Sequence, residues 1–520
     1  MRFDLIVIGS GPSGQKGAIA AAKLGKRVAL IEQQPKKLGG VCLHTGTIPS
    51  KAFREAIMVL TGFRHREIYP ESFERRRNVS VEELQRLATQ VVTHETNIVR
   101  HQLESNGVEL FAGKARFAGT HDIDVVADAD TDSGLTGSDT QVTRLSADRI
   151  LIAVGTRPLR PTHIPFDGEV IYDSEELLRL QRIPRSMIVI GGGVIGLEFA
   201  MMFAALGCQV TVTDGHAHLL PFCDREIVDV LMEQGRSLGL SFKLKQRLQS
   251  VARTGEQSGV VMLDNGRKLT AESVLFAAGR RGNTDSLNLE AAGLSADEQG
   301  RLWCNEFQQT WTKHIYGAGD VVGFPSLASV SMEQGRRAIC HAFDQPFLAT
   351  KMMPYGLYTT PEVAMIGPTE EQLRKDGIPY KVGTARFGET ARGHLAGDLD
   401  GMLKLLFDPQ SHKLLAVHCV GESACELIHI GQTVMSFDGT VEYLRDAVFN
   451  YPTMAECYKV AAFNGLNRAN TIEQSAEDVL AEIMARSGFD ARTLLTHREG
   501  DDEPLGTPAC ASGSSLVVAR

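Results

Sequence analysis

The chain has 520 residues, which at roughly 150 residues per domain predicts about three to four domains whose cores need no disulfide or metal. Its 54 Lys and Arg residues against 63 Asp and Glu residues give a formal net charge of −9, which excludes a general attraction to nucleic acids. The 9 cysteines are too sparse for a disulfide-bonded secreted domain, so a reducing cytoplasm is the expected location.

Two apolar stretches superficially resemble targeting or membrane segments. The run from Leu5 to Ile8 is too short for the apolar region of a signal peptide, so no export is expected. Met187–Gly207 is 21 residues long and carries one charge, Glu198. Its glycines suit a tight turn, and a carboxylate in the middle of a bilayer is costly, so we expect a buried globular segment and no membrane contact.

The first functional motif follows the strand-like run that ends at Ile8. Gly9, Gly11 and Gly14 have G-x-G-x-x-G spacing and precede an Ala-rich helical segment, while a second strand-like run ends at Glu32. Such glycines make the turn, admit a pyrophosphate to the backbone and pack helix on strand, and the acid suits ribose hydroxyls. The combination predicts a dinucleotide site; the alternative is a tight turn between packed elements.

The same motif recurs in the second half of the chain. Gly191, Gly193 and Gly196 follow another apolar run, and the next strand-like segment ends at Asp214. The first glycine and the acid are 23 positions apart in both copies. The repeat therefore predicts two dinucleotide sites in tandem doubly wound units.

Later segments extend both units and then change in character. One strand-like run in each unit ends in a glycine, Gly155 or Gly279, and Thr310–Val321 offers a strand and a turn with a possible capping acid. After Leu348, alternating apolar strands and helical runs predict a separate α+β domain. The polar, acidic C-terminal residues are expected to contain one amphipathic helix, Ser475 to Arg486, followed by disorder.

The segment GGVCLHTGTIPSKAFREA, residues 39–56, closely resembles the pyridine-nucleotide-disulfide oxidoreductase family. The resemblance extends from residue 1 to about 466. It implies an α/β fold with two tandem doubly wound, Rossmann-like domains for FAD and NAD(P) and a C-terminal α+β dimerisation domain. The implied bounds are 1–157 and 282–348 for the two parts of the FAD domain, 158–281 for the NAD(P) domain, 349–466 for the dimerisation domain and 467–520 for a largely disordered acidic tail.

The motifs and the resemblance together assign the cofactor-binding residues. The FAD stretches carry over to the first glycine motif with its acid and to the segment that ends at Asp320, while the second glycine motif becomes the nicotinamide-nucleotide site. The implied residues are Gly9, Gly11, Pro12, Ser13, Gly14, Glu32, Gly40, Cys42, Thr47, Lys51, Gly155, Gly191, Gly193, Gly196, Glu198, Asp214, Gly279, Gly319 and Asp320.

Two departures from the family pattern are informative. The family's redox disulfide joins cysteines five positions apart, but here Cys42 is followed at that spacing by Thr47, so we expect Cys42 to be a spectator thiol near the flavin. Where thiol-handling relatives have a catalytic histidine this chain has Tyr451, although the acid that orients it is retained as Glu456. A tyrosine of ordinary pKa cannot exchange protons with a dithiol at neutral pH. The combination resembles the soluble, Si-specific transhydrogenase branch of the family.

With dithiol chemistry absent, the expected reaction is transhydrogenation: NADPH reduces FAD, NADP⁺ leaves, and NAD⁺ takes the hydride at the same site. The resemblance places Lys51 beside the flavin, paired with Glu198, and places Tyr451 and Glu456 at the flavin of the other subunit of a homodimer. Pairing is physically sensible because an unpartnered buried acid is costly. The alternative is a surface lysine and a core glutamate with other partners.

The choice between NAD and NADP stays open in the sequence. Asp214 suits a ribose 2′-hydroxyl and repels a 2′-phosphate, but His216, His218 and Arg225 follow it, so we expect both nucleotides as substrates. The adjacent Arg280 and Arg281 are interpreted as structural.

One further cluster of potential metal ligands and two further functions are compatible with parts of the sequence. His418, Cys419, Cys425 and His429 fit no common zinc spacing, and no metal is expected. Two alternative functions use the same flavin: an NAD(P)H oxidase or quinone reductase, and a redox sensor without turnover.

Overall fold

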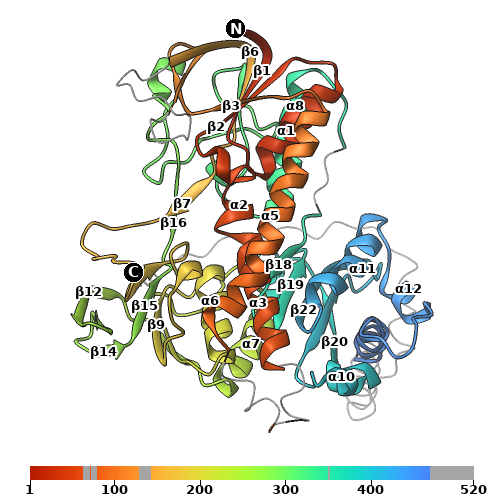
Figure 1. Cartoon of the computed structure of the whole chain (residues 1–520). Coiled ribbons are helices and arrows are strands. Elements are labelled where there is room, and N and C mark those ends of the chain that lie inside the picture. The colour runs from red at the N-terminus through yellow and green to blue at the C-terminus, as the bar shows by residue number, and fades with distance from the viewer. Residues whose placement is uncertain (63–68, 70, 72–78, 128–141, 349–351, 469–520) are drawn as a thin grey trace, which may run out of the picture. The chain divides into compact units, whose positions relative to one another are not determined.

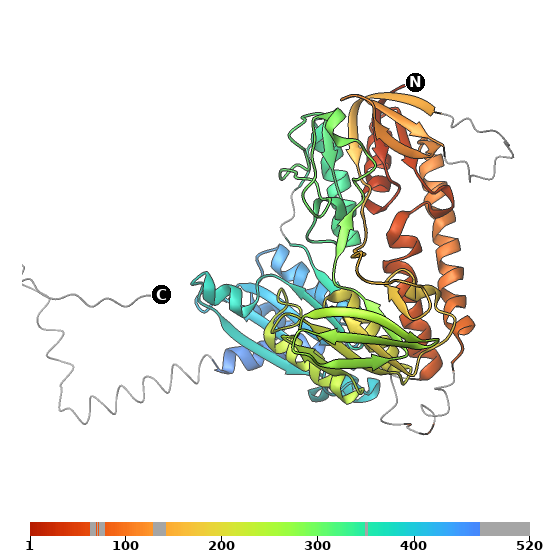
Figure 2. The ribbon, with the colours of Figure 1, turned by 90° about the vertical axis from the view of Figure 1, so that its left-hand side faces the viewer.

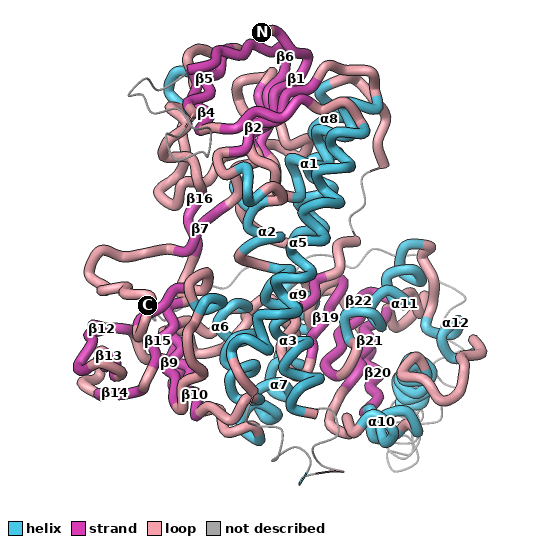
Figure 3. The backbone as a smooth tube through the Cα atoms, in the orientation of Figure 1, coloured by secondary structure: helices cyan, strands magenta, loops and turns pink. Residues whose placement is uncertain are grey.

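The computed structural model describes residues 1–62, 69, 71, 79–127, 142–348 and 352–468. The chain divides into two compact units, residues 1–465 and 466–520, and the architecture below is that of the first. The helix and the disorder expected from Ser475 onward lie outside the described residues. The strands of the first unit form three main sheets, drawn in magenta in Figure 3.

The first sheet has seven strands in the order β3-β2-β1-β6-β5-β4, and β17 also pairs with β6. Figure 1 labels its strands β1, β2, β3 and β6. Strands β3, β2, β1, β6 and β17 run parallel, whereas β4 and β5 are antiparallel additions. Leu5, Ile6 and Val7 of the central strand are fully buried, as expected for a strand covered on both faces. The strands are β1 (Arg2–Ile8), β2 (Val28–Glu32), β3 (Glu109–Ala112), β4 (Lys114–Phe117), β5 (Asp122–Val126), β6 (Val142–Ile152) and β17 (Ile315–Gly317).

Helices α1 (Pro12–Lys23) and α8 (Ala328–Ala342) pack against each other and against this sheet. Between them in the sequence lie α2 (Gly40–His44), α3 (Thr47–Thr61) and the long α5 (Val81–Ser105). A capping box formed by Ser80 and Glu83 begins α5, which then runs beside α3 (Figure 1).

The second sheet has five parallel strands in the order β11-β10-β9-β15-β8. These strands are β8 (Ile171–Asp173), β9 (Ser186–Ile190), β10 (Gln209–Asp214), β11 (Ser241–Leu244) and β15 (Ser273–Phe276), and the unit also contains α6 (Val194–Ala205) and α7 (Arg225–Ser237). A three-stranded antiparallel sheet, β12 (Leu248–Gly255), β13 (Ser258–Leu263) and β14 (Lys268–Ala271), packs its apolar side on β8, β9 and β15 (Figure 2). The two predicted doubly wound units are therefore confirmed.

The apolar stretch Met187–Gly207 is strand β9, a glycine turn and helix α6. Almost all of α6 is buried in the largest apolar core, which explains its continuous hydrophobicity. Within the described residues, no helix combines the length and the apolar character needed to cross a membrane.

Two short strands lie between the two doubly wound units. β7 (Thr156–Pro158) pairs antiparallel with β16 (Arg280–Gly282), at the two places where the chain passes between the parallel sheets. Arg280 donates hydrogen bonds to Thr156 Oγ1 at 2.8 Å and to its carbonyl oxygen at 2.9 Å. These bonds fit the structural interpretation of Arg280, which also lines the cleft described below, so for Arg280 and Arg281 that interpretation stays a prediction.

The third sheet is antiparallel throughout, with strand order β18-β19-β22-β21-β20. Its strands are β18 (Tyr355–Leu357), β19 (Glu362–Ile366), β20 (Lys381–Arg386), β21 (Met402–Phe407) and β22 (Leu414–Gly421). The helices are α9 (Glu370–Lys375), α10 (Ala391–Ala396), α11 (Ala424–Ser436), α12 (Val441–Asp446) and residues 456–468. This is the predicted α+β domain, whereas the predicted bounds of the individual domains stay predictions.

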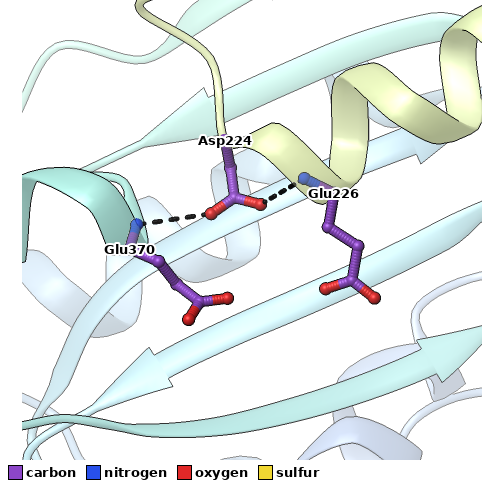
Figure 4. Close-up of side chains that lie close together, drawn as sticks. All are labelled: Asp224, Glu226 and Glu370. Atoms are coloured by element: carbon purple, nitrogen blue, oxygen red, sulfur yellow. Dashed lines mark hydrogen bonds between the residues drawn. The ribbon is translucent and has the colours of Figure 1, made fainter.

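A buried lysine joins this third part to the second parallel unit. Lys404 of β21 is 1% exposed, and its Nζ lies 2.9 Å from Asp224 Oδ1, 3.1 Å from Glu226 Oε2 and in contact with Glu370. Asp224 and Glu226 begin α7, while Glu370 begins α9, and their carboxylates gather at one point in Figure 4. The Lys404 ammonium supplies the cation at that point, so the three acids are a structural ion-pair cluster.

Candidate functional site

The first glycine motif forms the turn between β1 and α1. Gly9 has φ +102°, and an added Cβ would lie 2.4 Å from the carbonyl oxygen of Ala153. A Cβ on Gly14 would lie 1.9 Å from the carbonyl oxygen of Gly9. In contrast, nothing lies within 4 Å of a Cβ placed on Gly11. Gly9 and Gly14 are thus required by packing, and Gly11 leaves the backbone open to a ligand.

The acid at the end of β2 is held beside this turn. Glu32 Oε2 accepts hydrogen bonds from Ser10 N at 3.2 Å and Ser10 Oγ at 2.5 Å, and Oε1 accepts one from Gln34 N at 2.9 Å. The N-terminus of α1 has no side-chain cap, so its first N–H groups are available to an anion.

The second glycine motif repeats this geometry. Gly191 has φ +106°, and its added Cβ would lie 2.8 Å from the carbonyl oxygen of Ala277. A Cβ on Gly196 would lie 1.9 Å from the carbonyl oxygen of Gly191. Gly192 N donates to Asp214 Oδ2 at 2.7 Å, as Ser10 N does to Glu32. The sequence repeat is therefore a structural repeat.

A cleft of about 1040 Å³ connects the first motif with the start of α6. Its walls come from both doubly wound units and from β18 and α11 of the α+β domain. The predicted site residues that line it are Gly9, Gly11, Pro12, Ser13, Glu32, Gly40, Cys42, Thr47, Lys51, Gly155, Gly193, Glu198, Gly279, Gly319 and Asp320.

The remaining predicted site residues lie outside the lining of this cleft. Gly14 and Gly196 pack helix against strand, and Gly191 packs against the end of β15. Asp214 is held by Gly192 N and by His216, whose N and Nδ1 lie 2.8 and 2.7 Å from Asp214 Oδ1.

Tyr451 and Glu456 also lie outside the lining of the cleft. Tyr451 is 75% exposed, and Glu456 Oε2 accepts a hydrogen bond of 3.4 Å from Thr453 N. Within one chain they are not brought together with Lys51.

Lys51 and Glu198 form the charged centre of the cleft. Lys51 Nζ lies 2.7 Å from Glu198 Oε2, with side-chain exposures of 25% and 7%. Lys51 is the fifth residue of α3, and Glu198 comes from the otherwise apolar α6. The pairing implied by the resemblance is present, and the alternative of an exposed lysine with an independently partnered glutamate is wrong.

Tyr358, which follows β18, is a site residue that the sequence did not reveal. Its backbone N donates to Glu198 Oε1 at 2.9 Å, and Lys51 Nζ lies 5.1 Å from the centre of its ring. Burial raises the pKa of the Tyr358 hydroxyl to about 12, so this hydroxyl stays protonated at neutral pH. No local pattern in residues 354–361 indicates these contacts, because they depend on the fold.

Asp320 and the start of α8 also line the cleft. Burial raises the pKa of the Asp320 carboxyl, and its Oδ2 accepts a hydrogen bond of 3.4 Å from Thr156 Oγ1. The N-terminus of α8, at Leu327, has no side-chain cap and lines the cleft. The cleft thus combines uncapped helix N-termini, those of α1 and α8 among them, with the carboxylates of Glu32, Glu198 and Asp320. This set suits phosphates, hydroxyls and an electron-rich ring edge.

Two thiols line the cleft, and both are free. Burial raises the pKa of Cys42, although a hydrogen bond with the Thr47 side chain works in the opposite direction. Burial also raises the pKa of Cys425, whose Sγ lies 3.8 Å from the carbonyl oxygen of Leu357. Neutral, separately held thiols are poor partners for disulfide exchange.

Comparison with known proteins identifies the family of the chain. The family model described as pyridine nucleotide-disulphide oxidoreductase matches residues 3–335, and its dimerisation-domain model matches residues 353–462. The chain belongs to the pyridine nucleotide-disulphide oxidoreductase family. Its two parallel units are the nucleotide-binding part of that family fold, and its antiparallel sheet is the dimerisation domain.

Curated relatives in this family match along nearly their whole length. The soluble pyridine nucleotide transhydrogenase of Mycobacterium tuberculosis is 46% identical over 473 residues, which are 91% of this chain and 99% of the relative. The soluble pyridine nucleotide transhydrogenase of Photorhabdus laumondii is 41% identical over 476 residues, with 90% and 99% of the two chains covered.

Solved structures of other proteins are also similar to this chain. The HOCl-induced flavoprotein disulfide reductase RclA from Escherichia coli has a TM-score of 0.76 at 28% identity, covering 88% of this chain and 99% of that one. LpdA from Mycobacterium tuberculosis has a TM-score of 0.79 at 26% identity, covering 89% and 99%.

Proposed function

We propose that this chain is a transhydrogenase that moves a hydride from NADPH to NAD⁺, giving NADP⁺ and NADH, with bound FAD. The observation that carries the proposal is the residue found five positions after Cys42. It is Thr47, and its side chain contacts Cys42 where relatives with a redox disulfide have a second sulfur. The names of the curated relatives support the same reaction.

The residues of the cleft fit FAD. The open backbone at Gly11 and the uncapped start of α1 suit its pyrophosphate, and Glu32 suits a ribose. Asp320 and the start of α8 suit the polyol and the polar edge of the ring system. When bound, FAD supplies a carrier that accepts a hydride from one nicotinamide and returns it to another.

The side chains of the protein bind and orient the nucleotides and place charge beside the flavin. The Lys51 ammonium gives the cleft a fixed positive charge, which Glu198 positions from the neighbouring helix. Asp214, at the second glycine motif, accepts hydrogen bonds from a nucleotide ribose. We propose that NAD and NADP bind this second motif alternately, which requires ping-pong kinetics.

We propose that the active form is a homodimer in the cytoplasm. The dimerisation domain supports self-association, and it exposes large apolar side chains, with Phe437 84% and Val448 94% accessible in the single chain. Tyr451 and Glu456 lie on the same domain and are proposed to complete the site of the partner subunit. The eight free thiols of the described residues support a reducing compartment.

The test is reduction of the purified FAD-loaded protein by NADPH without oxygen, followed by mixing with thio-NAD⁺, oxygen or a quinone. Rapid reoxidation by thio-NAD⁺, with parallel-line kinetics when both substrates are varied, is expected. Reoxidation by oxygen or quinone alone would establish an oxidase or quinone reductase instead. Absence of turnover with every acceptor would establish a sensor, and substantial dihydrolipoamide oxidation would overturn the argument from Thr47.

A further inference from the structure

The segment after β11 lies directly against the acid of the second nucleotide motif. Gln246 N donates to the carbonyl oxygen of Asp214 at 3.1 Å, and Lys245 N donates to that of His216 at 3.0 Å. A Cβ placed on Gly215 would lie 3.2 Å from Arg247 Cγ. Arg247, which is 33 positions away from Asp214 in the sequence, therefore runs its side chain past the residue that follows this acid.

The structural repeat allows the place of Arg247 to be compared with that of a residue in the first motif. In the first motif, Gly113 N donates to the carbonyl oxygen of Glu32 at 3.0 Å, as Gln246 N does to that of Asp214. In the second unit one extra residue, Lys245 with φ +57°, lies between the strand partner of the acid and this N–H. Counted from the shared hydrogen bond, the next residues, Lys114 and Arg247, are equivalent. Lys114 lines the cleft together with Glu32. By this equivalence Arg247 lies at the ribose end of the second nucleotide site.

The other His and Arg side chains near Asp214 already have partners, whereas Arg247 has none among the described residues. Arg225 already lies 3.5 Å from Asp229 and 3.3 Å from His218, and the His216 ring is bonded to Asp214. Arg247 is exposed, and within the described part of the chain no hydrogen bond or ion pair of its guanidinium is present. A free guanidinium beside a ribose acid is the group that a 2′-phosphate needs, because the acid alone repels it.

We infer that Arg247 binds the 2′-phosphate of NADP(H) and is the residue that lets one site accept both nucleotides. NADH places its 2′-hydroxyl on Asp214, whereas the 2′-phosphate of NADPH turns to the guanidinium. This inference rests on the proposed function for its biological meaning, but the binding claim can be tested without turnover.

The experiment uses the FAD-loaded full chain and two probes, 2′,5′-ADP and 5′-AMP, in calorimetric titrations. Arg247→Ala should weaken 2′,5′-ADP about 10- to 100-fold, as expected for lost charge-assisted hydrogen bonds, while 5′-AMP changes less than about twofold. Arg247→Lys should restore part of the loss, and the salt dependence of 2′,5′-ADP binding should be shallower in Arg247→Ala.

Arg236→Ala is the matched control. Arg236 is an exposed arginine in the last turn of α7 in the same unit, and it pairs with Glu233 at 3.2 Å. Its removal changes the net charge equally and should leave the affinity ratio of the two probes unchanged. Equal loss of both probes in Arg247→Ala, or no loss of either, would overturn the inference.

The outcomes separate this inference from the proposed function. If Arg247→Ala loses 2′,5′-ADP but the native protein fails to reduce thio-NAD⁺ with NADPH, the assigned reaction is wrong and the phosphate site stands. If transhydrogenation is present and the two probes respond alike in Arg247→Ala, the phosphate site is wrong and the reaction stands.

Discussion

The backbone N–H of Tyr358 donates a hydrogen bond of 2.9 Å to Glu198 Oε1, the carboxylate oxygen that Lys51 does not use. The Lys51 ammonium in turn lies 5.1 Å from the centre of the Tyr358 ring. These three residues come from α3, α6 and the start of the dimerisation domain. The position of the cation in the cleft therefore depends on all three parts of the fold.

Glu198→Gln tests the charge of this pair. The amide keeps the shape and the hydrogen bond from Tyr358 N but leaves Lys51 without its counter-charge. We expect the rate of flavin reduction by NADPH to fall about tenfold or more, equivalent to ~1.4 kcal/mol, with little change in NADPH affinity. Stopped-flow absorbance measures both quantities. A double-mutant cycle with Lys51→Met should be strongly non-additive, and additive losses would mean that the two groups act independently.

Tyr358→Leu tests the aromatic contact with Lys51. A cation over a ring contributes ~0.5–2 kcal/mol, so the leucine variant should reduce flavin about 2- to 30-fold more slowly. Tyr358→Phe keeps the ring and should behave like the native protein, because the hydroxyl stays protonated. If the phenylalanine variant is as slow as the leucine variant, the hydroxyl acts in the reaction. Flavin reduction is followed across a pH series.

A pair of glycine substitutions separates packing from cofactor approach. Gly14→Ala places a methyl group 1.9 Å from the Gly9 carbonyl oxygen and should prevent correct folding. Gly11→Ala meets no atom within 4 Å and should fold normally, but its methyl group occupies the space needed by a pyrophosphate. The flavin absorbance per chain and the thermal unfolding midpoint distinguish the two. Full flavin content in Gly11→Ala would contradict the assigned phosphate position.

Thr47→Cys should install the missing sulfur. Because the Thr47 side chain contacts Cys42, air oxidation is expected to join residues 42 and 47 and to remove two titratable thiols. Transhydrogenation should be slower in the oxidised variant and recover after treatment with a dithiol reductant. Thr45→Cys is a control, because Thr45 also lines the cleft and lies at a different spacing from Cys42. Equal thiol loss in both variants would argue against a specific pairing.

Lys404→Met should destabilise the protein strongly. It leaves the buried Asp224 and its neighbour Glu370 without their cation, and breaking a buried pair costs about 3–5 kcal/mol. Urea unfolding measures the loss. Adding Asp224→Asn to the variant should recover part of it, since one unpaired charge is then removed; no recovery would mean that packing rather than charge is responsible.

The same cluster predicts acid sensitivity. Burial works to raise the pKa of Asp224, but nearby His418 and Lys404 outweigh it, and the Lys404 hydrogen bond likewise outweighs burial at Glu370, so both pKa values lie below their ordinary ones. A depressed folded-state pKa gives stability that is present above about pH 4.5 and is lost as pH falls through the folded pKa values. Lys404→Met should show a smaller loss of stability over this range, and an unchanged acid profile would contradict the assignment.

The sequence predicted the parts of the site that are built from local rules. Gly9 and Gly191 need positive φ, and Gly14 and Gly196 need the absence of a side chain, so the motif alone indicates both turns. The doubly wound units followed from the same repeat. Lys51 and Glu198 were paired by resemblance, and the unfavourable burial of an isolated carboxylate points in the same direction.

Other contacts could not be predicted because they join distant segments without a local signal. Tyr358 meets Glu198 across 160 positions, and Lys404 meets Asp224 across 180. Neither Tyr358, which follows β18, nor Lys404, within β21, carries a local sign of its contact in the sequence. Arg247 is recognised only when the carbonyl oxygen of Asp214 is seen to accept the N–H of its neighbour.

The repeated glycine turn divides recognition into two kinds of atoms. In the proposed function, main-chain groups at Gly11 and Gly193 contact the pyrophosphate that all these dinucleotides share, while side chains such as Arg247 contact the ribose substituent that differs between them. Substitutions at such side chains can therefore change coenzyme preference, by design or during evolution, without disturbing the geometry in which the hydride moves.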